Sequence, residues 1–330
     1  HYPFENKERF EGSFPADFIA EGLDQTRGWF YTLMVLSTAL FDRPAFRNVV
    51  VNGLVLAEDG RKMSKRLKNY PDPMHVLNAY GADALRLHLI SSPVVRAEDL
   101  CFTEEGVKHS LRHLLLPWWN AYSVFVTYAR VDNWTPAAAA GQPSSTHLLD
   151  RWILSSLESL NTGVVEAMDE YVLQRSVRPF VQFIEDLTNW YIRRSRRRFW
   201  KSSDDDDKAQ AYATLYEVLL RLSKIAAPFV PFISDAIYRN LRSEDMPSSV
   251  HLCDFPEANP AGRDAALERQ MRDAMAVVAM GRVIRTERNL KIRQPLHSIH
   301  IACRDKARLT GIRELADLIG EELNVREVEY

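Results

Sequence analysis

The sequence has 330 residues, of which 46% are hydrophobic, enough for a sizeable core and for about two domains. Its 42 Lys and Arg residues against 44 Asp and Glu residues give a formal net charge of −2, which excludes a uniformly basic or acidic surface, so any contact with nucleic acid has to be local. Cys101, Cys253 and Cys303 are too far apart in sequence for a zinc ribbon or a small disulfide framework, and indicate reduced thiols in the cytoplasm.

Neither end of the sequence nor its apolar stretches indicate a membrane protein. The apolar stretch at residues 29–41 is shorter than the roughly 20 residues that a membrane-crossing helix needs. No signal-peptide pattern follows His1, and a start at His instead of Met indicates a piece of a longer protein. We therefore expect a cytoplasmic protein without a membrane span.

Residues 1–105 alternate short β-rich runs with helical ones, which predicts an α/β region. The predicted elements are strands at 18–20, 49–51 and 54–56, a buried helix at 29–41 after a polar turn, a turn at Asp59-Gly60, and a helix at 75–88 after Pro71 and Pro73.

Residues 106–255 change to apolar spacings of three and four, which predicts an all-α bundle of four or five helices. The predicted helices are 111–129 with a kink at Pro117, 153–168, 177–191 and 209–225, with loops at 135–145 and at the acidic run 204–207, and with an interruption at Pro228 and Pro231.

Residues 256–330 form the third predicted region, a small α+β subdomain. A polar segment at 254–262 that contains proline leads into a long helix at 267–290, and a strand is predicted at 298–302.

The first candidate site is the basic loop Gly60-Arg61-Lys62-Met63-Ser64-Lys65-Arg66. The positive charges of its four cations repel one another, and a bound polyanion would offset this repulsion. The ammonium groups of Lys62 and Lys65, with the Ser64 hydroxyl, can hold a triphosphate and offset the charge that builds on departing pyrophosphate. The alternative is a solvated basic loop without a ligand.

The second candidate site follows the first predicted strand, where α/β sheets bind ligands beyond their strand ends. Glu21 and Asp24 can pair with an amino-acid ammonium or with ribose hydroxyls. Gly22 precedes the turn, Gln25 can donate and accept hydrogen bonds, and Trp29 offers a flat wall to an aliphatic side chain. The alternative is that Asp24 merely caps the helix and Trp29 belongs to the core.

Four ordered segments carry a family resemblance. Lys62–Arg66 resembles the KMSKS signature of class I aminoacyl-tRNA synthetases, with Arg in place of the last Ser. Residues 21–30 resemble the amino-acid and adenylate pocket of isoleucyl-tRNA synthetases. Asn69-Tyr70-Pro71-Asp72-Pro73 and Gly81-Ala82-Asp83-Ala84-Leu85-Arg86 follow in the order of that family. The resemblance continues more loosely through the helical region.

This resemblance implies a fold, an activity and partners. The fold would be a partial Rossmann-like nucleotide-binding domain with the KMSKS-type loop, a helical anticodon-binding domain and the small C-terminal subdomain. The reaction would attach isoleucine to tRNA(Ile) through isoleucyl-adenylate, with ATP and Mg²⁺ as substrate and no zinc bound by this chain. We also expect a monomer.

The same resemblance assigns roles to single residues. It places Glu21, Gly22, Asp24, Gln25 and Trp29 on the adenylate, Gly53 close to the adenine, and Lys65 on the triphosphate, helped by Lys62, Met63 and Ser64. Lys62, Ser64 and Lys65 would be the catalytic residues.

Two parts of the family pattern are missing. The sequence contains neither the HIGH-type histidine motif nor the editing insert, so we predict that this chain neither activates nor edits isoleucine alone. Two alternatives stay open: a noncatalytic tRNA-binding module derived from a synthetase, and a synthetase for another aliphatic amino acid.

A third candidate site is a cluster of arginines near residue 195. Arg193, Arg196 and Arg197 fall opposite the apolar stripe of the predicted helix, with Trp200 beside them, and can bind RNA phosphates and stack on a base. Arg198 falls on the stripe itself, which predicts a buried structural arginine. The alternative is a solvated face paired with Glu185, Asp186 and the acidic run.

Two weaker patterns complete the sequence. His109 and His113 are four residues apart on a helix but lack the glutamate of a zinc protease, so we predict no metal site. A second basic stretch either contacts tRNA or forms a helix surface followed by a loop; it comprises Arg285, Arg288, Lys291 and Arg293.

Overall fold

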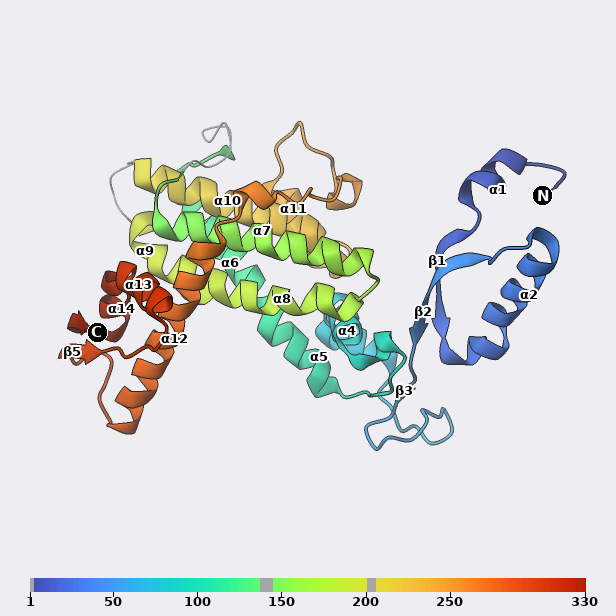
Figure 1. Ribbon diagram of the computed structural model, residues 1–330, viewed down its shortest axis with the longest axis horizontal. Helices are drawn as coiled ribbons and strands as arrows, with labels where there is room; N and C mark the ends of the chain where they lie inside the picture. Colours follow the sequence, from blue (N-terminus) through green and yellow to red (C-terminus); the bar gives the residue numbers. More distant parts are fainter. Residues whose placement is uncertain (1–2, 137–144, 201–205) are drawn as a thin grey trace. The chain divides into compact units, whose positions relative to one another are not determined.

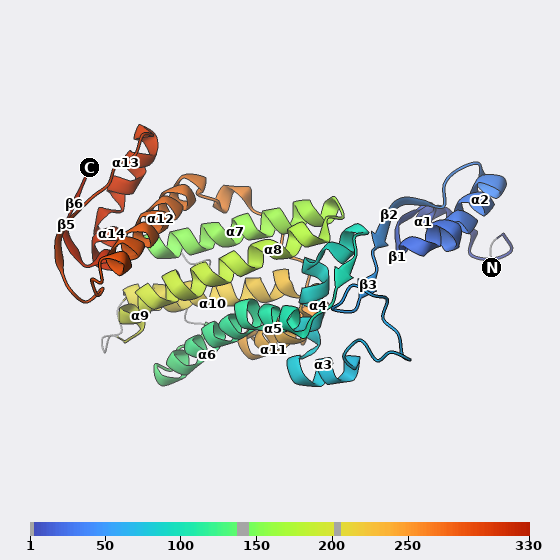
Figure 2. The ribbon, with the colours of Figure 1, turned by 90° about the horizontal axis from the view of Figure 1, so that it is seen from below.

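The computed structural model describes residues 3–136, 145–200 and 206–330 (Figures 1 and 2). They form two compact units, one of His1–Pro143 with Leu160–Ala258 and the other of Ser144–Ser159 with Asn259–Tyr330. Helix α7 (Leu148–Asp169) contributes to both units. The domain boundaries at 105 and 255 stay predictions. Across the described ranges, every helix is too short or too polar to cross a membrane.

The chain begins with a parallel strand pair and its connecting helix, as predicted. Strands β1 (Ala16–Gly22) and β2 (Phe46–Asn52) pair in parallel, and α2 (Trp29–Phe41) connects them (Figure 1). The register brings the carboxyl ends of both strands to the same edge. The short α1 (Lys7–Ser13) places Phe10 against Phe41 of α2, with ring centroids 5.2 Å apart.

The prediction that the helix at 29–41 is buried is wrong for most of its residues. Only Phe30 and Ser37 of α2 are buried, whereas Tyr31 and Leu40 are 62% and 71% exposed. The helix is apolar on all sides, which is typical of a buried helix. Within the described chain, however, neighbouring elements cover only part of its surface.

The next segment holds a second parallel pair and two short helices. Strands β3 (Val55–Leu56) and β4 (Leu100–Cys101) pair in parallel. The single helix predicted at 75–88 is in fact two helices, α3 (Pro73–Tyr80) and α4 (Ala82–Ser91). Gly81 separates them because its φ of 84° lies in the left-handed region, where glycine is favoured.

An all-α bundle follows, as predicted (Figure 2). Its helices are α5 (Glu104–Ser110), α6 (Leu116–Val131), α8 (Leu173–Glu185), α9 (Arg193–Trp200), α10 (Asp206–Ala226) and α11 (Pro231–Leu241), together with α7. The π-helical turns Leu111–Leu115 and Asp186–Ile192 join α5 to α6 and α8 to α9 without a break. Fully buried Trp118, Tyr191, Tyr212 and Tyr238 mark the core.

The prolines and acidic residues of this bundle differ in part from expectation. Pro117 lies in the first turn of α6, directly after a π-helical turn. This turn accommodates the disturbance that the proline causes in the helical backbone. Pro228 and Pro231 interrupt the helical run as predicted: α10 ends at Ala226, and Pro231 occupies the first turn of α11, where a missing N–H costs little. Asp206 and Asp207 belong to the first turn of α10, where anions are favourable, and not to a loop. Most of the predicted loop at 135–145, and residues 204 and 205, lie outside the described ranges.

The second unit has the predicted α+β character. It contains α12 (Ala265–Glu287), β5 (Leu296–His300), α13 (Lys306–Glu314), α14 (Ala316–Leu323) and β6 (Val325–Glu329). Strands β5 and β6 pair in parallel. Buried Glu268 of α12 accepts hydrogen bonds from the hydroxyls of Ser155 and Ser159 at 2.5 and 2.7 Å, which ties α12 to the first half of α7.

Candidate functional site

The second candidate site begins at the carboxyl edge of the β1–β2 pair. Glu21 lies opposite Val51 and Gly22 opposite Asn52, so the predicted pocket segment and Gly53 leave the sheet at the same edge. The Gly22 N–H donates to the Glu21 carboxylate at 3.0 Å. This edge is where parallel sheets bind ligands.

The turn after β1 is held by a glutamine. The Oε1 of Gln25 accepts a hydrogen bond from the Trp29 N–H at 2.9 Å, at the start of α2, and its Nε2 donates to Asp24 at 3.4 Å. Gln25, not Asp24, therefore caps the helix. Trp29 is 45% exposed, so it is not a core residue. Both alternative interpretations of this segment are therefore wrong, and ligand binding by Glu21, Asp24 and Trp29 stays a prediction.

Gly53 is fixed by close backbone packing. Its N–H donates to the carbonyl of Val94 at 2.8 Å, and a Cβ at this position would lie 2.0 Å from the carbonyl oxygen of Glu98. No larger residue fits unless the backbone moves. Packing thus explains the glycine, and its position near adenine stays a prediction.

The basic loop starts from a tight turn. The Ala57 N–H donates to the Arg61 carbonyl at 2.9 Å, and Lys62 forms an isolated antiparallel bridge with Leu56 of β3. Gly60 has a φ of 78°, the left-handed conformation that the Asp59-Gly60 turn requires. The predicted turn is confirmed, and it places Lys62 at the exit of a short β structure.

Asn69 holds the middle of the loop. Its Nδ2 donates to the carbonyl oxygen of Lys62 at 3.1 Å, and its Oδ1 accepts from the Ser64 N–H at 2.9 Å. The Ser64 hydroxyl in turn accepts from the Leu67 N–H at 3.4 Å. In the sequence, Asn69 is recognisable only as part of an ordered motif; a carboxamide a few residues after a lysine-rich loop is the signal that could have indicated its role.

The charges of the loop are not equivalent. Arg61 forms an ion pair with Asp59 at 2.5 Å, and this hydrogen-bonded pairing lowers the pKa of Asp59 and raises that of Arg61. Lys62, Lys65 and Arg66 are exposed and form no ion pair with any described residue. Three cations, not the four expected, are therefore available to a polyanion.

The structure does not bring the first two candidate sites into direct contact. In the part of the chain that is described, no hydrogen bond, ion pair or ring contact joins residues 21–29 to Lys62–Arg66. The two sites are linked along the chain by β2 and β3.

The third candidate site has the predicted face. Arg193, Arg196 and Arg197 are exposed on α9, whereas Arg198 is 7% exposed and pairs with Asp207 at 2.7 Å, as its place on the apolar stripe predicts. Arg196 and Arg197 form no ion pair within the described ranges. The solvated-face alternative, in which these three arginines pair with Glu185, Asp186 and the acidic run, stays open, because residues 204 and 205 lie outside the described ranges.

An aromatic cavity adjoins these arginines. Trp200 is 57% exposed, and its ring centroid lies 6.4 Å from that of Tyr128. A cavity of about 220 Å³ is lined by these two rings and by Arg196. A cation beside an exposed and a partly buried aromatic ring is an arrangement that can hold an unstacked base.

The second basic stretch divides into one structural and three exposed residues. Arg285 is 5% exposed and donates to the carbonyls of Lys291, Gln294, Leu323 and Asn324 at 2.6 to 3.2 Å. It holds the loop after α12 in place. Arg288, Lys291 and Arg293 are exposed on or beside that loop. Because Arg285 is buried, neither interpretation applies to it, and both stay open for the three exposed residues.

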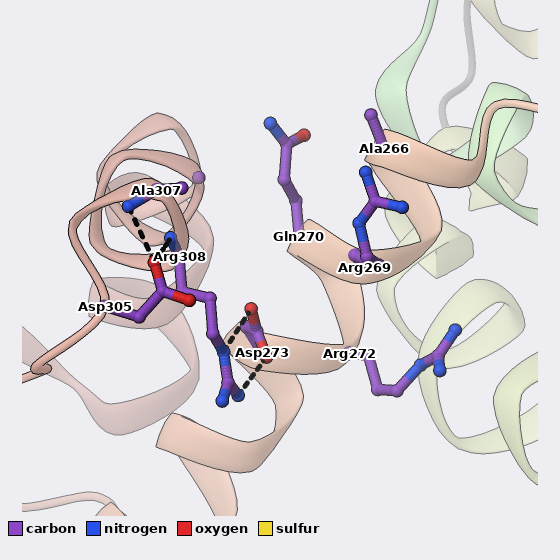
Figure 3. A pocket seen from close by; sticks show the side chains of 9 residues that line it. Ala266, Arg269, Gln270, Arg272, Asp273, Asp305, Ala307 and Arg308 are labelled. Carbon is purple, nitrogen blue, oxygen red and sulfur yellow. Dashed lines mark hydrogen bonds and ion pairs between the residues drawn. The ribbon is translucent and has the colours of Figure 1, made fainter.

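Sequence reasoning missed a cavity of about 560 Å³ between α12 and α13 (Figure 3). Arg308 binds Asp273 through two hydrogen bonds of 3.1 and 2.5 Å, and Asp305 caps α13 by accepting from the Ala307 N–H at 2.9 Å. These polar groups satisfy one another. For metals, the rings of His109 and His113 lie 4.1 Å apart, and no group of three or more potential ligands occurs within the described ranges.

Comparison with known proteins places these sites in a family. Residues 1–101 match the family model "tRNA synthetases class I (I, L, M and V)", and residues 150–301 match "Anticodon-binding domain of tRNA ligase". Over its whole length the chain is 57% identical to an isoleucine–tRNA ligase of Protochlamydia amoebophila, 54% to one of Chlamydia trachomatis serovar L2 and 52% to one of Treponema denticola.

The chain spans about a third of these relatives, 32%, 32% and 31% of their lengths. Among solved structures, it resembles the LeuRS of a ternary complex, LeuRS-tRNA-LeuAMS, from Agrobacterium radiobacter K84, with a TM-score of 0.57 and 20% identity over 76% of this chain and 30% of that one. That likeness concerns the fold. Two family models match in sequence order, the class I tRNA synthetase model first and the anticodon-binding model second, and relatives above half identity align with every residue, so the chain matches about a third of an isoleucine–tRNA ligase.

Proposed function

We propose that this chain supplies part of the ATP-dependent attachment of isoleucine to tRNA(Ile). In this proposal the Lys62–Arg66 loop binds the triphosphate of ATP, the edge of the β1–β2 pair binds isoleucyl-adenylate, and α9 binds tRNA. The observation that carries the proposal is the loop: its backbone is held by Asn69 while Lys62 and Lys65 stay exposed and without ion pairs in the described chain.

The loop fits the charge changes of amino-acid activation. The isoleucine carboxylate attacks the α-phosphate in line, and the bond from that phosphorus to the pyrophosphate oxygen breaks. The ammonium groups of Lys62 and Lys65 would hold the triphosphate and stabilise the negative charge on the leaving pyrophosphate, and the Ser64 hydroxyl can donate to a phosphate oxygen. Mg²⁺ would arrive with ATP as part of the substrate.

The first 56 residues fit a part of a nucleotide-binding sheet. We propose that β1, α2 and β2 belong to a Rossmann-like domain, with the adenylate beyond the carboxyl edge of the strands. There Glu21 and Asp24 can pair with the isoleucine ammonium or the ribose hydroxyls, and half-exposed Trp29 can face the aliphatic side chain. The polar atoms of Gln25 are already engaged within the turn, so its role in this proposal is to hold Trp29 in place.

The helical region fits RNA binding. The exposed arginines of α9 offer phosphate contacts, and the cavity between Trp200 of α9 and Tyr128 of α6 offers a stacking surface beside them. A matched anticodon-binding family model over residues 150–301 supports the same partner.

Titration of this chain with MgATP in a calorimeter tests the triphosphate site. We expect the double variant K62Q/K65Q to bind about 10- to 100-fold more weakly, which corresponds to about 0.7 to 1.4 kcal/mol for each lost ammonium contact in a solvent-exposed loop. The matched control is R61Q. It also removes one charge from the loop, but the ion pair with Asp59 already neutralises that charge.

Two results would contradict the proposal: no MgATP binding by the unmodified chain, or an equal loss in R61Q. Absent ATP binding with intact tRNA binding would favour a noncatalytic RNA-binding module instead. We expect no pyrophosphate exchange from the chain alone, because it lacks the histidine motif that the family resemblance requires.

A further inference from the structure

Two side chains of opposite charge on α4, those of Asp83 and Arg86, hydrogen-bond to the backbone between α10 and α11. The carboxylate of Asp83 accepts hydrogen bonds from the backbone N–H groups of Phe232 and Ile233 at 3.2 and 2.7 Å. One helical turn later, the guanidinium of Arg86 donates to the carbonyls of Pro228 and Phe229 at 3.1 and 3.2 Å. These contacts join residues more than 140 positions apart in the sequence.

The charges match the helix ends that they meet. The first N–H groups of α11 have no partner inside that helix, and an anion at a helix start is stabilised by those groups and by the helix dipole. The backbone carbonyls that follow α10 are hydrogen-bond acceptors with a partial negative charge, and the guanidinium of Arg86 donates to them. Asp83 is only 7% exposed, so the contact excludes water. The α10–α11 turn is therefore held by a paired anion and cation from a helix of the loop-bearing segment.

The other end of α4 is also bound to the bundle. The carbonyl of Ser91, its last residue, accepts a hydrogen bond from the Nε2 of Gln174 at 2.8 Å. Gln174 is 4% exposed in the first turn of α8, and α8 continues through a π-helical turn into α9. One helix thus contacts both the α10–α11 turn and the helix that leads to the exposed arginines.

The basic loop reaches α4 through a short, capped connection. Asn69, which holds the loop, is followed by Asp72, which caps α3 by accepting from the Met74 N–H at 2.9 Å, and α4 begins directly after Gly81. We propose that Asp83, Arg86 and Gln174 are positioning residues that fix the Lys62–Arg66 loop on the helical bundle. The reason for fixing the loop rests on the proposed function, whereas the contacts of these three residues do not depend on it.

A merely structural role for Asp83 is the competing interpretation, and hydrogen exchange of the intact chain separates the two. In D83A, we expect the Phe232 and Ile233 amides to exchange about fivefold faster, the factor for loss of a helix cap. If Asp83 positions the loop, the amides of Ser64 and Lys68, both hydrogen-bonded within the loop, also exchange several-fold faster, because residues 61–91 then open as a unit.

The matched control is D235A. Asp235 anchors α11 from another side, by accepting from the Ser249 hydroxyl at 2.6 Å and the Val250 N–H at 3.0 Å, and among the described residues it forms no hydrogen bond or ion pair with α4. It should destabilise α11 and leave exchange of the loop amides unchanged. If D83A proves too unstable to fold, R86Q, which removes only the cation, gives the same comparison in milder form.

The outcomes distinguish this inference from the function on which it rests. Faster loop exchange in D83A but not in D235A supports positioning, whether or not the chain binds ATP. Unchanged loop exchange in D83A, or equal effects in both variants, overturns it, even if MgATP and tRNA bind as proposed. Where MgATP does bind, we expect D83A to weaken it several-fold and D235A to leave it unchanged.

Discussion

The two basic regions of this chain present their charge in different ways. In α9 the cations lie on a regular helix, so their spacing decides which are exposed, and the arginine on the apolar stripe is buried against Asp207. In the Lys62–Arg66 loop no periodicity exists, and a side-chain amide, that of Asn69, fixes the backbone instead. In both regions one cation is paired with a nearby carboxylate, so counting charges overstates the charge that a ligand meets.

The largest expected effect concerns the helix. The triple variant R193Q/R196Q/R197Q should bind tRNA(Ile) about 10²- to 10³-fold more weakly at low salt, because each lost phosphate contact removes about one unit of the salt-dependence slope. Filter binding across a salt series measures both quantities. The control K7Q/R9Q/R47Q makes the same change in net charge elsewhere. An equal loss in the control would show that net charge, not the α9 face, attracts the RNA.

The second prediction concerns the buried arginine of the same helix. R198M should reduce the free energy of unfolding by about 1 to 3 kcal/mol, because it removes a buried guanidinium that donates to the carboxylate and the carbonyl of Asp207 at the start of α10. Urea denaturation followed by circular dichroism measures the change. The tRNA affinity of the folded variant should stay unchanged, since Arg198 does not reach the surface. A loss of tRNA binding with normal stability would place Arg198 in the interface.

The third prediction concerns the loop. N69A should weaken MgATP binding about five- to tenfold, because two hydrogen bonds that hold the loop backbone are lost. N69D keeps the acceptor for the Ser64 N–H but loses the donor to Lys62, so an intermediate effect is expected. Calorimetry gives the affinities, with tRNA binding as the internal control. If N69A binds MgATP as the unmodified chain does, the loop takes its shape from the nucleotide and not from Asn69.

The contrast between the two regions also explains how much the sequence could predict. Helical periodicity placed the bundle, the exposed face of α9 and the burial of Arg198, because a regular repeat fixes which side chains face the core. Composition and motif order placed the basic loop and the strand edge at Glu21. These signals are local, and the elements built from them are present.

Long-range contacts were not predictable in the same way. Asp83 was recognised only as part of a motif, because its partners, the amides at the start of α11, are about 150 residues away. The division of the helix at 75–88 depended on the left-handed φ of Gly81, which a sequence pattern does not reveal. The exposure of α2 was missed because an all-round apolar helix predicts burial without indicating which partner covers it.

The smallest expected effect lies between the two regions, where α4 packs against α5. His88 of α4 lies against Gly106, where a Cβ would be 2.3 Å from its ring, and meets the edge of Phe102 with centroids 5.8 Å apart. Burial, and then the charge of His109, lowers the pKa of His88 below its usual value of 6.5. The folded state therefore binds fewer protons at this site than the unfolded chain, so stability is fully present above pH 6.5 and falls as the pH drops towards the folded pKa.

Urea denaturation of the unmodified chain and of H88F at several pH values between 5 and 7.5 tests this sign. We expect the unmodified chain to lose stability over that interval and H88F, which fills a similar volume and does not titrate, to lose less. The loss should be smaller than that of R198M, because it concerns one partly buried ring. Parallel pH profiles for the two proteins would show that another group, not His88, governs the acid sensitivity of the segment that joins the loop to the bundle.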